Sequence, residues 1–239
     1  MTWKNLLRKL PVPLRTLLIR FLQLIVRKQN AEMSYWRKRF MDEGGVFMNS
    51  HYERIMLAMA GETTSDFVQG KIVADFGCGP RGSLNWADGA LIRIGIDLLA
   101  DKYADEFTKH IILQNMIWVK STEKVIPLPS DSVDILFTMN ALDHVQYFDQ
   151  ICNELIRVLK RGGLFVGSIN IDEPPTLTEP QQLTEAIVWK HLLNKLQVER
   201  YIVADKVSDN ERYVELFKQS PTRTPGKPGV IWVRARKPS

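Results

Sequence analysis

The sequence contains little cysteine, with only Cys78 and Cys152 among 239 residues. Two cysteines allow at most one disulfide bond, and they lack the paired spacing of a cysteine zinc site. A disulfide-built scaffold is therefore excluded, and the sequence predicts no metal site. Because free cysteines are typical of a reducing compartment, we expect a cytoplasmic protein.

Long apolar runs are also missing. The most apolar stretch, from Thr16 to Val26, is interrupted by Arg20 and Gln23, so it is much shorter than the roughly 20 residues that a membrane-spanning helix needs. The overall composition, 45% hydrophobic and 25% charged, excludes a disordered or collagen-like chain. We expect residues 31–239 to form one domain with a full hydrophobic core.

Acidic residues are absent from residues 1–30, which hold seven of the 32 Lys and Arg residues. Residues 31–239 therefore carry 25 bases and 27 acids, although the net charge of the whole chain is +5. A nucleic-acid-binding protein usually carries its basic patch on the folded domain. We therefore expect no nucleic-acid partner, and residues 1–30 need an explanation of their own.

Residues 1–30 have the pattern of a basic amphipathic segment. On a helix, Thr16, Arg20, Gln23 and Arg27 share one narrow stripe, and leucine, isoleucine and phenylalanine cover most of the remaining surface. One interpretation is a peripheral anchor on an anionic membrane surface. A helix packed on the domain or on a partner, and a cleaved targeting peptide, are the alternatives.

From residue 50 onward, short β-rich runs alternate with helical stretches, which is typical of a sheet covered by helices. Ser50 and Glu53 have the spacing of a capping box, which predicts a helix that ends near Ala60. Two further helices are predicted over 148–159, ended by Gly162–Gly163, and over 184–196. Strands are predicted over 71–76, 91–97, 117–122, 133–138, 164–169, 198–203 and 230–236.

The first predicted strand runs into the glycine-rich stretch Asp75-Phe76-Gly77-Cys78-Gly79. Glycines at the carboxyl end of such a strand let the backbone approach a ligand closely. Asp75 would repel a pyrophosphate, whereas it would hold an ammonium group. The pattern therefore favours a nucleoside with a cationic amino-acid end over a dinucleotide.

A second acid, Asp97, ends the next predicted strand. From this place a carboxylate can accept hydrogen bonds from ribose hydroxyl groups. A helix cap or a surface ion pair would be the alternative for either acid alone. Two acids at adjacent strand ends favour a ligand site.

These stretches resemble the class I S-adenosylmethionine-dependent methyltransferases, of the type 11 kind. The likeness covers residues 50 to 170 and includes Asp75-x-Gly77-x-Gly79, Gly95-Ile96-Asp97-Leu98, the segments 126–134 and 140–145, and the turn 158–163. The resemblance implies an α/β, Rossmann-like fold, with a seven-stranded, mostly parallel sheet, helices on both faces and an antiparallel last strand. Residues 230–236 would then insert between the fifth and sixth strands.

The resemblance also implies the cofactor S-adenosyl-L-methionine and a set of contacts to it. Asp75 and the backbone of Gly77, Cys78 and Gly79 would face its methionine end. Asp97 would bind the ribose, and Leu98 would lie against the adenine. The acid that the family often places on the adenine amino group is replaced here by Thr122-Glu123, so Glu123 or the backbone takes that role. Asn140 would contact the cofactor through its carbonyl or side chain.

His144 is the candidate general base, because it begins the segment after the fourth predicted strand and imidazole titrates near neutrality. Its alternative is a structural histidine, and Asp143 beside it is expected to point away. The loop from Asn170 to Pro180 is expected on the acceptor side, and His51 and Tyr52 on a lid made mobile by Glu43-Gly44-Gly45.

The expected function is methylation of a small-molecule, lipid or glycan acceptor, with oxygen and nitrogen both open. A catalytically silent cofactor-binding scaffold and, less favoured, a nicotinamide-dependent oxidoreductase are the alternatives. The chain would be cytoplasmic, or peripheral on a membrane if residues 1–30 bind lipid.

Overall fold

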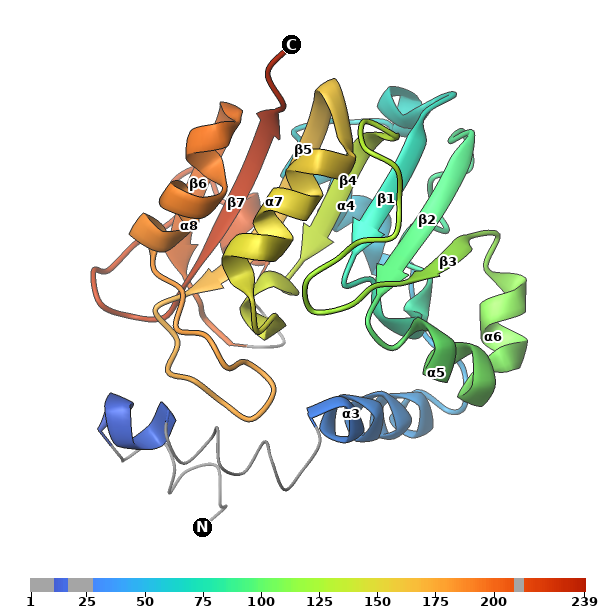
Figure 1. Ribbon diagram of the computed structural model, residues 1–239, viewed down its shortest axis with the longest axis horizontal. Coiled ribbons are helices and arrows are strands. Elements are labelled where there is room, and N and C mark those ends of the chain that lie inside the picture. Colours follow the sequence, from blue (N-terminus) through green and yellow to red (C-terminus); the bar gives the residue numbers. More distant parts are fainter. Residues whose placement is uncertain (1–10, 17–27, 209–212) are drawn as a thin grey trace.

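The computed structural model describes residues 11–16, 28–208 and 213–239, so most of the basic segment 1–30 lies outside the described residues (Figure 1). Residues 12–16 are helical. The strands are β1 (Ile72–Phe76), β2 (Ile92–Asp97), β3 (Ile117–Lys120), β4 (Val133–Met139), β5 (Leu159–Ile171), β6 (Gln197–Asp205) and β7 (Gly229–Arg236). The α-helices are α3 (Lys28–Asp42), α4 (His51–Ala60), α5 (Ala100–Glu106), α6 (Thr108–Leu113), α7 (Phe148–Val158) and α8 (Glu185–His191).

The seven strands form one sheet in the order β3-β2-β1-β4-β5-β7-β6. The five strands from β3 to β5 are parallel, and β7 runs antiparallel to both β5 and β6. The predicted fold class is therefore confirmed, including the insertion of the last strand between the fifth and sixth. Since β1, β2 and β4 are parallel, their carboxyl ends meet at one edge of the sheet.

Helices cover both faces of the sheet, because successive residues of a strand point to opposite faces. In β1, Val73 packs in a cluster with α4, whereas Ala74 packs in a cluster with α7 and α8. Figure 1 shows α7 and α8 in front of the sheet and α4 behind it. A third, aromatic cluster joins α3 to α5 and α6. Among the described residues, no helix has the length and apolar character needed to cross a membrane.

Several predicted boundaries are wrong. Ser50 precedes α4 in a helical conformation and its side chain makes no capping hydrogen bond, so the predicted capping box does not form. The helix α7 ends at Val158, where the chain turns directly into β5, and Gly162-Gly163 lie within that strand. β3 ends at Lys120 rather than at residue 122. The predicted helix 184–196 divides into α8 and a short 3-10 helix, Leu193–Lys195.

Candidate functional site

Asp75 lies near the end of β1 and is 1% exposed. Its Oδ2 accepts a hydrogen bond from the Ser83 hydroxyl, whereas its Oδ1 is buried with no partner among the described residues. Burial raises the pKa of Asp75 to about 7, although the Ser83 bond opposes the shift. A buried acceptor without a donor carries a free-energy cost, so the ammonium group of an amino-acid ligand suits this place.

The glycine loop follows Asp75 and requires glycine at two positions. Gly77 has φ +74° and Gly79 has φ +56°, a region that side chains with a Cβ rarely adopt. A Cβ on Gly77 would overlap the Cβ of Ala141, and one on Gly79 would lie 2.8 Å from Cη2 of Trp36. The loop is therefore packed between the segment after β4 and the helix α3, with Gly79 buried and Gly77 only partly exposed. Cys78, between the two glycines, is buried, and burial raises the pKa of its thiol well above the ordinary value.

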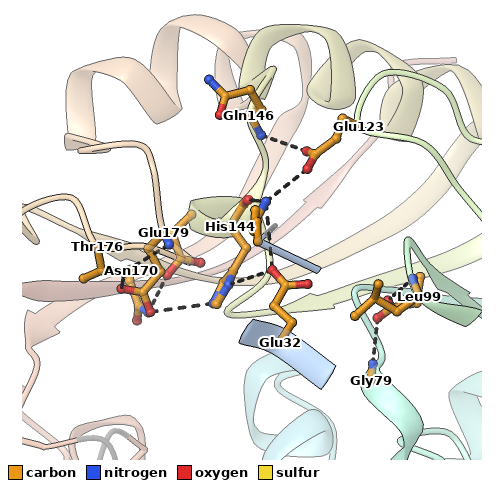
Figure 2. Close-up of polar contacts among 12 residues, drawn as sticks. Glu32, Gly79, Leu99, Glu123, His144, Gln146, Asn170, Thr176 and Glu179 are labelled. Carbon is orange, nitrogen blue, oxygen red and sulfur yellow. Dashed lines mark hydrogen bonds and ion pairs between the residues drawn. The ribbon is translucent and has the colours of Figure 1, made fainter. Parts of the chain in front are cut away.

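Asp97 ends β2 next to the glycine loop, as predicted. Its Oδ2 accepts a hydrogen bond from the Gly79 amide at 3.0 Å, and its Oδ1 accepts one from the Leu99 amide at 2.9 Å (Figure 2). Burial raises the pKa of Asp97 to about 6, although both amide bonds oppose the shift. Each carboxylate oxygen keeps acceptor capacity beyond its amide bond, so the residue fits a pair of ribose hydroxyls. Leu98 follows it and is only partly exposed.

Glu123 lies at the same edge, but its carboxylate already has partners. Oε1 accepts a hydrogen bond from Lys28 Nζ at 3.1 Å, and Oε2 accepts one from the Gln146 amide at 2.9 Å. The Thr122 hydroxyl accepts the Val125 amide at 2.9 Å and so closes a turn. The adenine contact assigned to these two residues stays a prediction, and Glu123 would make it with acceptor capacity beyond its bonds to Lys28 and Gln146.

Asn140 follows β4 with φ +50°. Its side-chain Nδ2 donates to the Tyr213 hydroxyl at 2.5 Å, and its Oδ1 accepts from the Ser168 hydroxyl at 3.1 Å. The side chain is therefore used in joining β4, β5 and the segment after β6. A cofactor contact through the Asn140 carbonyl stays a prediction.

The helix α3 lies across the carboxyl edge of the sheet, a placement that the sequence patterns did not predict (Figure 1). Trp36 packs on Gly79 and lies 6.0 Å from Phe47 and 6.4 Å from Tyr103, between ring centroids. At its first turn, Lys28 bonds Glu123 and also donates to the His144 carbonyl. Apolar spacing of Met33, Trp36 and Phe40 could have predicted a helix here, but not its position.

The lid predicted from Glu43-Gly44-Gly45 has a fixed attachment. Glu43 forms an ion pair with Arg81 of the glycine loop, and the Glu43 carboxylate also accepts the Met48 amide at 2.9 Å. Arg81 is 8% exposed and donates to the Met48 carbonyl at 3.2 Å. The segment that follows α3 is thus tied to the glycine loop. Arg81 carries this contact and was not among the predicted site residues.

His144 lies in the short 3-10 helix Leu142–His144 after β4, facing α3 (Figure 2). Its Nδ1 is 3.8 Å from Glu32 Oε1, and its Nε2 is 3.7 Å from Glu179 Oε1. Burial by itself lowers the pKa of His144, but the contact with Glu32 and the charges of Asp143 and Glu179 outweigh burial and raise it to about 9. At neutral pH His144 therefore carries a proton, which it must lose before it can act as a general base.

Asp143 and His144 form no hydrogen bond or ion pair with each other among the described residues, as expected, but their side chains converge rather than point apart. The tight 3-10 turn brings ligand atoms of Asp143, His144 and Glu179 within 4.8 Å of one another. Glu179 comes from the loop after β5, the loop expected on the acceptor side. The predicted histidine is thus joined by two carboxylates, one of them from a distant segment.

Comparison with known proteins relates the central part of the chain to methyltransferases. Residues 74–167 match the family model of the methyltransferase domain. The malonyl-[acyl-carrier protein] O-methyltransferase of Marinomonas sp. (strain MWYL1) is 28% identical over 197 residues, which are 81% of this chain and 66% of that protein. The chain thus spans about two thirds of the length of this relative.

Two solved structures share the fold. An S-adenosylmethionine-dependent methyltransferase from Mesorhizobium loti matches with a TM-score of 0.57 and 18% identity, covering 75% of this chain and 96% of that one. Geranyl diphosphate methyltransferase, solved in complex with S-adenosylmethionine, matches with a TM-score of 0.56 and 15% identity, covering 79% of this chain and 85% of that one. The matched domain begins just before Asp75 and extends through Asp97 and His144. Residues 74–167 therefore carry a methyltransferase domain, and the comparisons support a class I S-adenosylmethionine-dependent methyltransferase.

Proposed function

We propose that this chain binds S-adenosylmethionine at the carboxyl ends of β1 and β2 and transfers its methyl group to a hydroxyl group of a small-molecule or lipid acceptor beside His144. The observation that carries the donor site is the bond between Asp97 and the Gly79 amide, next to the buried, unpartnered Oδ1 of Asp75. The cofactor supplies an electrophilic methyl group. Asp97 would hold the ribose and Asp75 the ammonium group.

The charges around His144 support a neutral acceptor over an anionic one. Five carboxylates and three cations lie around the acceptor site, with a protonated His144 counted as one of the cations. A carboxylate substrate entering this site would meet like charge in partly desolvated surroundings, which is unfavourable. The carboxylates belong to Glu32, Glu123, Asp143, Glu173 and Glu179, and the cations to Lys28, Lys206 and His144.

A hydroxyl acceptor also explains why polar groups that can take a proton gather here. Transfer of a methyl group from a sulfonium depends mostly on alignment, and an amine acceptor needs no base. A hydroxyl acceptor usually does need one. We therefore propose oxygen as the accepting atom. An amine is the second acceptor class, because the same carboxylates would attract an ammonium group.

The decisive experiment is turnover of methyl-labelled cofactor with matched acceptors. Phenols and primary alcohols would be compared with amines of the same carbon skeleton, and with a malonyl thioester as the anionic member. The proposal expects label in the neutral hydroxyl compounds. Transfer to the malonyl thioester alone would overturn the assignment of a neutral acceptor. Binding of a nicotinamide dinucleotide, without binding of S-adenosylmethionine, would overturn the donor site.

We further propose an anionic membrane surface as a partner of residues 1–30. The excess of seven bases without an acid supports this proposal, with Arg15 buried and Lys28 paired with Glu123. Within that segment Leu14 is 52% exposed, and Met41, near the end of α3, is 75% exposed. Binding of residues 1–30 to a membrane surface would bring the acceptor site close to lipid-soluble substrates.

A further inference from the structure

Beside the proposed cofactor site, Asp143, His144 and Glu179 form a cluster in which a ligand atom of each lies within 4.8 Å of the other two (Figure 2). Asp143 and His144 come from the 3-10 helix after β4, and Glu179 comes from the loop after β5. The cluster combines one imidazole nitrogen with two carboxylates. These donors suit divalent cations of borderline or hard character, such as Mn²⁺.

The distance between His144 and Glu179 exceeds that of a hydrogen bond and fits an ion pair as well as two ligands of one ion. Nε2 and Oε1 are 3.7 Å apart, whereas N–H···O bonds span about 2.7 to 3.2 Å. Two ligand atoms each about 2.1 Å from a metal ion stand roughly 3.0 to 4.2 Å apart, depending on the angle at the ion. The pair therefore already has the separation that a shared ion requires.

Asp143 provides an independent observation. It is 4% exposed, and its Oδ1 is buried with no hydrogen-bond partner among the described residues. A buried carboxylate oxygen without a donor is costly, because the charge has lost its water. A cation held by this oxygen, Glu179 and His144 would remove that cost.

Two of the three residues also have the kind of neighbour that orients a metal ligand. Asn170 Nδ2 donates to Asp143 Oδ2 at 2.8 Å, and the Thr176 hydroxyl donates to Glu179 Oε2 at 3.1 Å. Glu32 lies 3.8 Å from His144 Nδ1, the ring nitrogen opposite the cluster. At this distance, which exceeds hydrogen-bond length, Glu32 acts on the ring through its charge, and an ion would displace the proton from the nitrogen that faces it.

We infer that Asp143, His144 and Glu179 bind a divalent metal ion at the acceptor side of the site. Three protein ligands leave coordination positions open, as in catalytic metal centres. An acceptor hydroxyl that reached the ion would lose its proton to solvent more readily. Its oxygen would then bond the methyl carbon of the sulfonium donor, while the carbon–sulfur bond breaks and its electron pair remains on sulfur. This catalytic role rests on the proposed function, whereas binding of the ion does not.

The test is a titration of the full, chelator-treated chain with Mn²⁺, followed by the electron paramagnetic resonance signal of free Mn²⁺. The inference expects one saturable site. Glu179→Gln keeps the shape of the side chain and removes the charge, so it should weaken Mn²⁺ binding at least 10-fold. Asp143→Asn should act in the same direction, with thermal unfolding measured to establish that the buried substitution still folds.

Glu185→Gln is the matched control, because Glu185 lies in α8, is not among the carboxylates around His144, and accepts a hydrogen bond from the Tyr201 hydroxyl at 2.7 Å. It should bind Mn²⁺ like the parent chain. Absence of saturable binding at millimolar Mn²⁺, or equal binding by Glu179→Gln, would overturn the inference. Titration with S-adenosylmethionine in the presence of a chelator separates the two proposals. Cofactor binding without Mn²⁺ binding would refute the metal site alone, and the reverse result would refute the donor site.

Discussion

The contact between Gly77 and Ala141 makes a sharp prediction about how the cofactor loop is held. A Cβ at position 77 would overlap the Ala141 Cβ and lie 3.5 Å from the Ala141 Cα. Gly77 also has φ +74°, where an L side chain costs about 1 to 2 kcal/mol. Overpacking adds about 1 to 3 kcal/mol. Gly77→Ala should therefore lower the free energy of unfolding by about 2 to 5 kcal/mol.

The two costs can be separated with two further variants. Gly70 has φ +70° and no atom within 4 Å of a Cβ built there, so Gly70→Ala carries the strain without the overlap. Adding Ala141→Gly to Gly77→Ala removes the overlapping Cβ and leaves the strain. The double mutant should therefore be more stable than the sum of the single changes by about 1 to 3 kcal/mol.

Urea unfolding of these variants, with the slope checked for two-state behaviour, gives the free energies directly. Titration with S-adenosylmethionine reports whether the loop still binds. Two results would refute the reasoning. One is a Gly77→Ala variant no less stable than Gly70→Ala. The other is a double mutant whose destabilisation equals the sum of the single changes within about 0.5 kcal/mol.

Four further predictions concern the site and the basic segment. Asp97→Ala should cost about 1.5 to 3 kcal/mol of affinity for S-adenosylmethionine, measured by calorimetry, and unchanged affinity would remove the ribose assignment. The pKa of Asp75 is raised to about 7 in the folded chain. From about pH 4 to 7 the folded state therefore binds more protons than the unfolded state, and the contribution of Asp75 to the free energy of unfolding falls as pH rises. The melting temperature of Asp75→Asn should therefore depend less on pH across that window, and an identical dependence would contradict the shift. For a hydroxyl acceptor, His144→Ala should lower turnover by about 100-fold with cofactor affinity retained, and normal turnover would return His144 to a structural role. The full chain should sediment with anionic vesicles at low salt and detach as salt rises toward molar. A variant that lacks residues 1–27, and so keeps Lys28 and α3, should stay in solution. Equal binding of vesicles by both chains would refute the anchor.

Much of the fold was predictable because local sequence patterns indicate its strands and helices. Alternating β-rich and helical runs predicted all seven strands, since their periodicity follows from which side chains must be buried. The glycine loop and the acids Asp75 and Asp97 were predictable from adjacent strand ends. Boundaries were less predictable. The Ser50 capping box failed, and α7 ended before Gly162, because packing against the sheet outweighed these local signals.

The tertiary structure alone decided how the site is enclosed and charged. Lys28 reaches Glu123 across 95 positions of sequence, and Glu179 meets His144 from a different loop. No local pattern encodes such contacts, because they depend on where α3 and the loop after β5 pack. The sequence therefore determined which residues are the candidates for holding the cofactor. Only the packed chain placed Glu32 and Glu179 on either side of His144, where their charges keep it protonated at neutral pH.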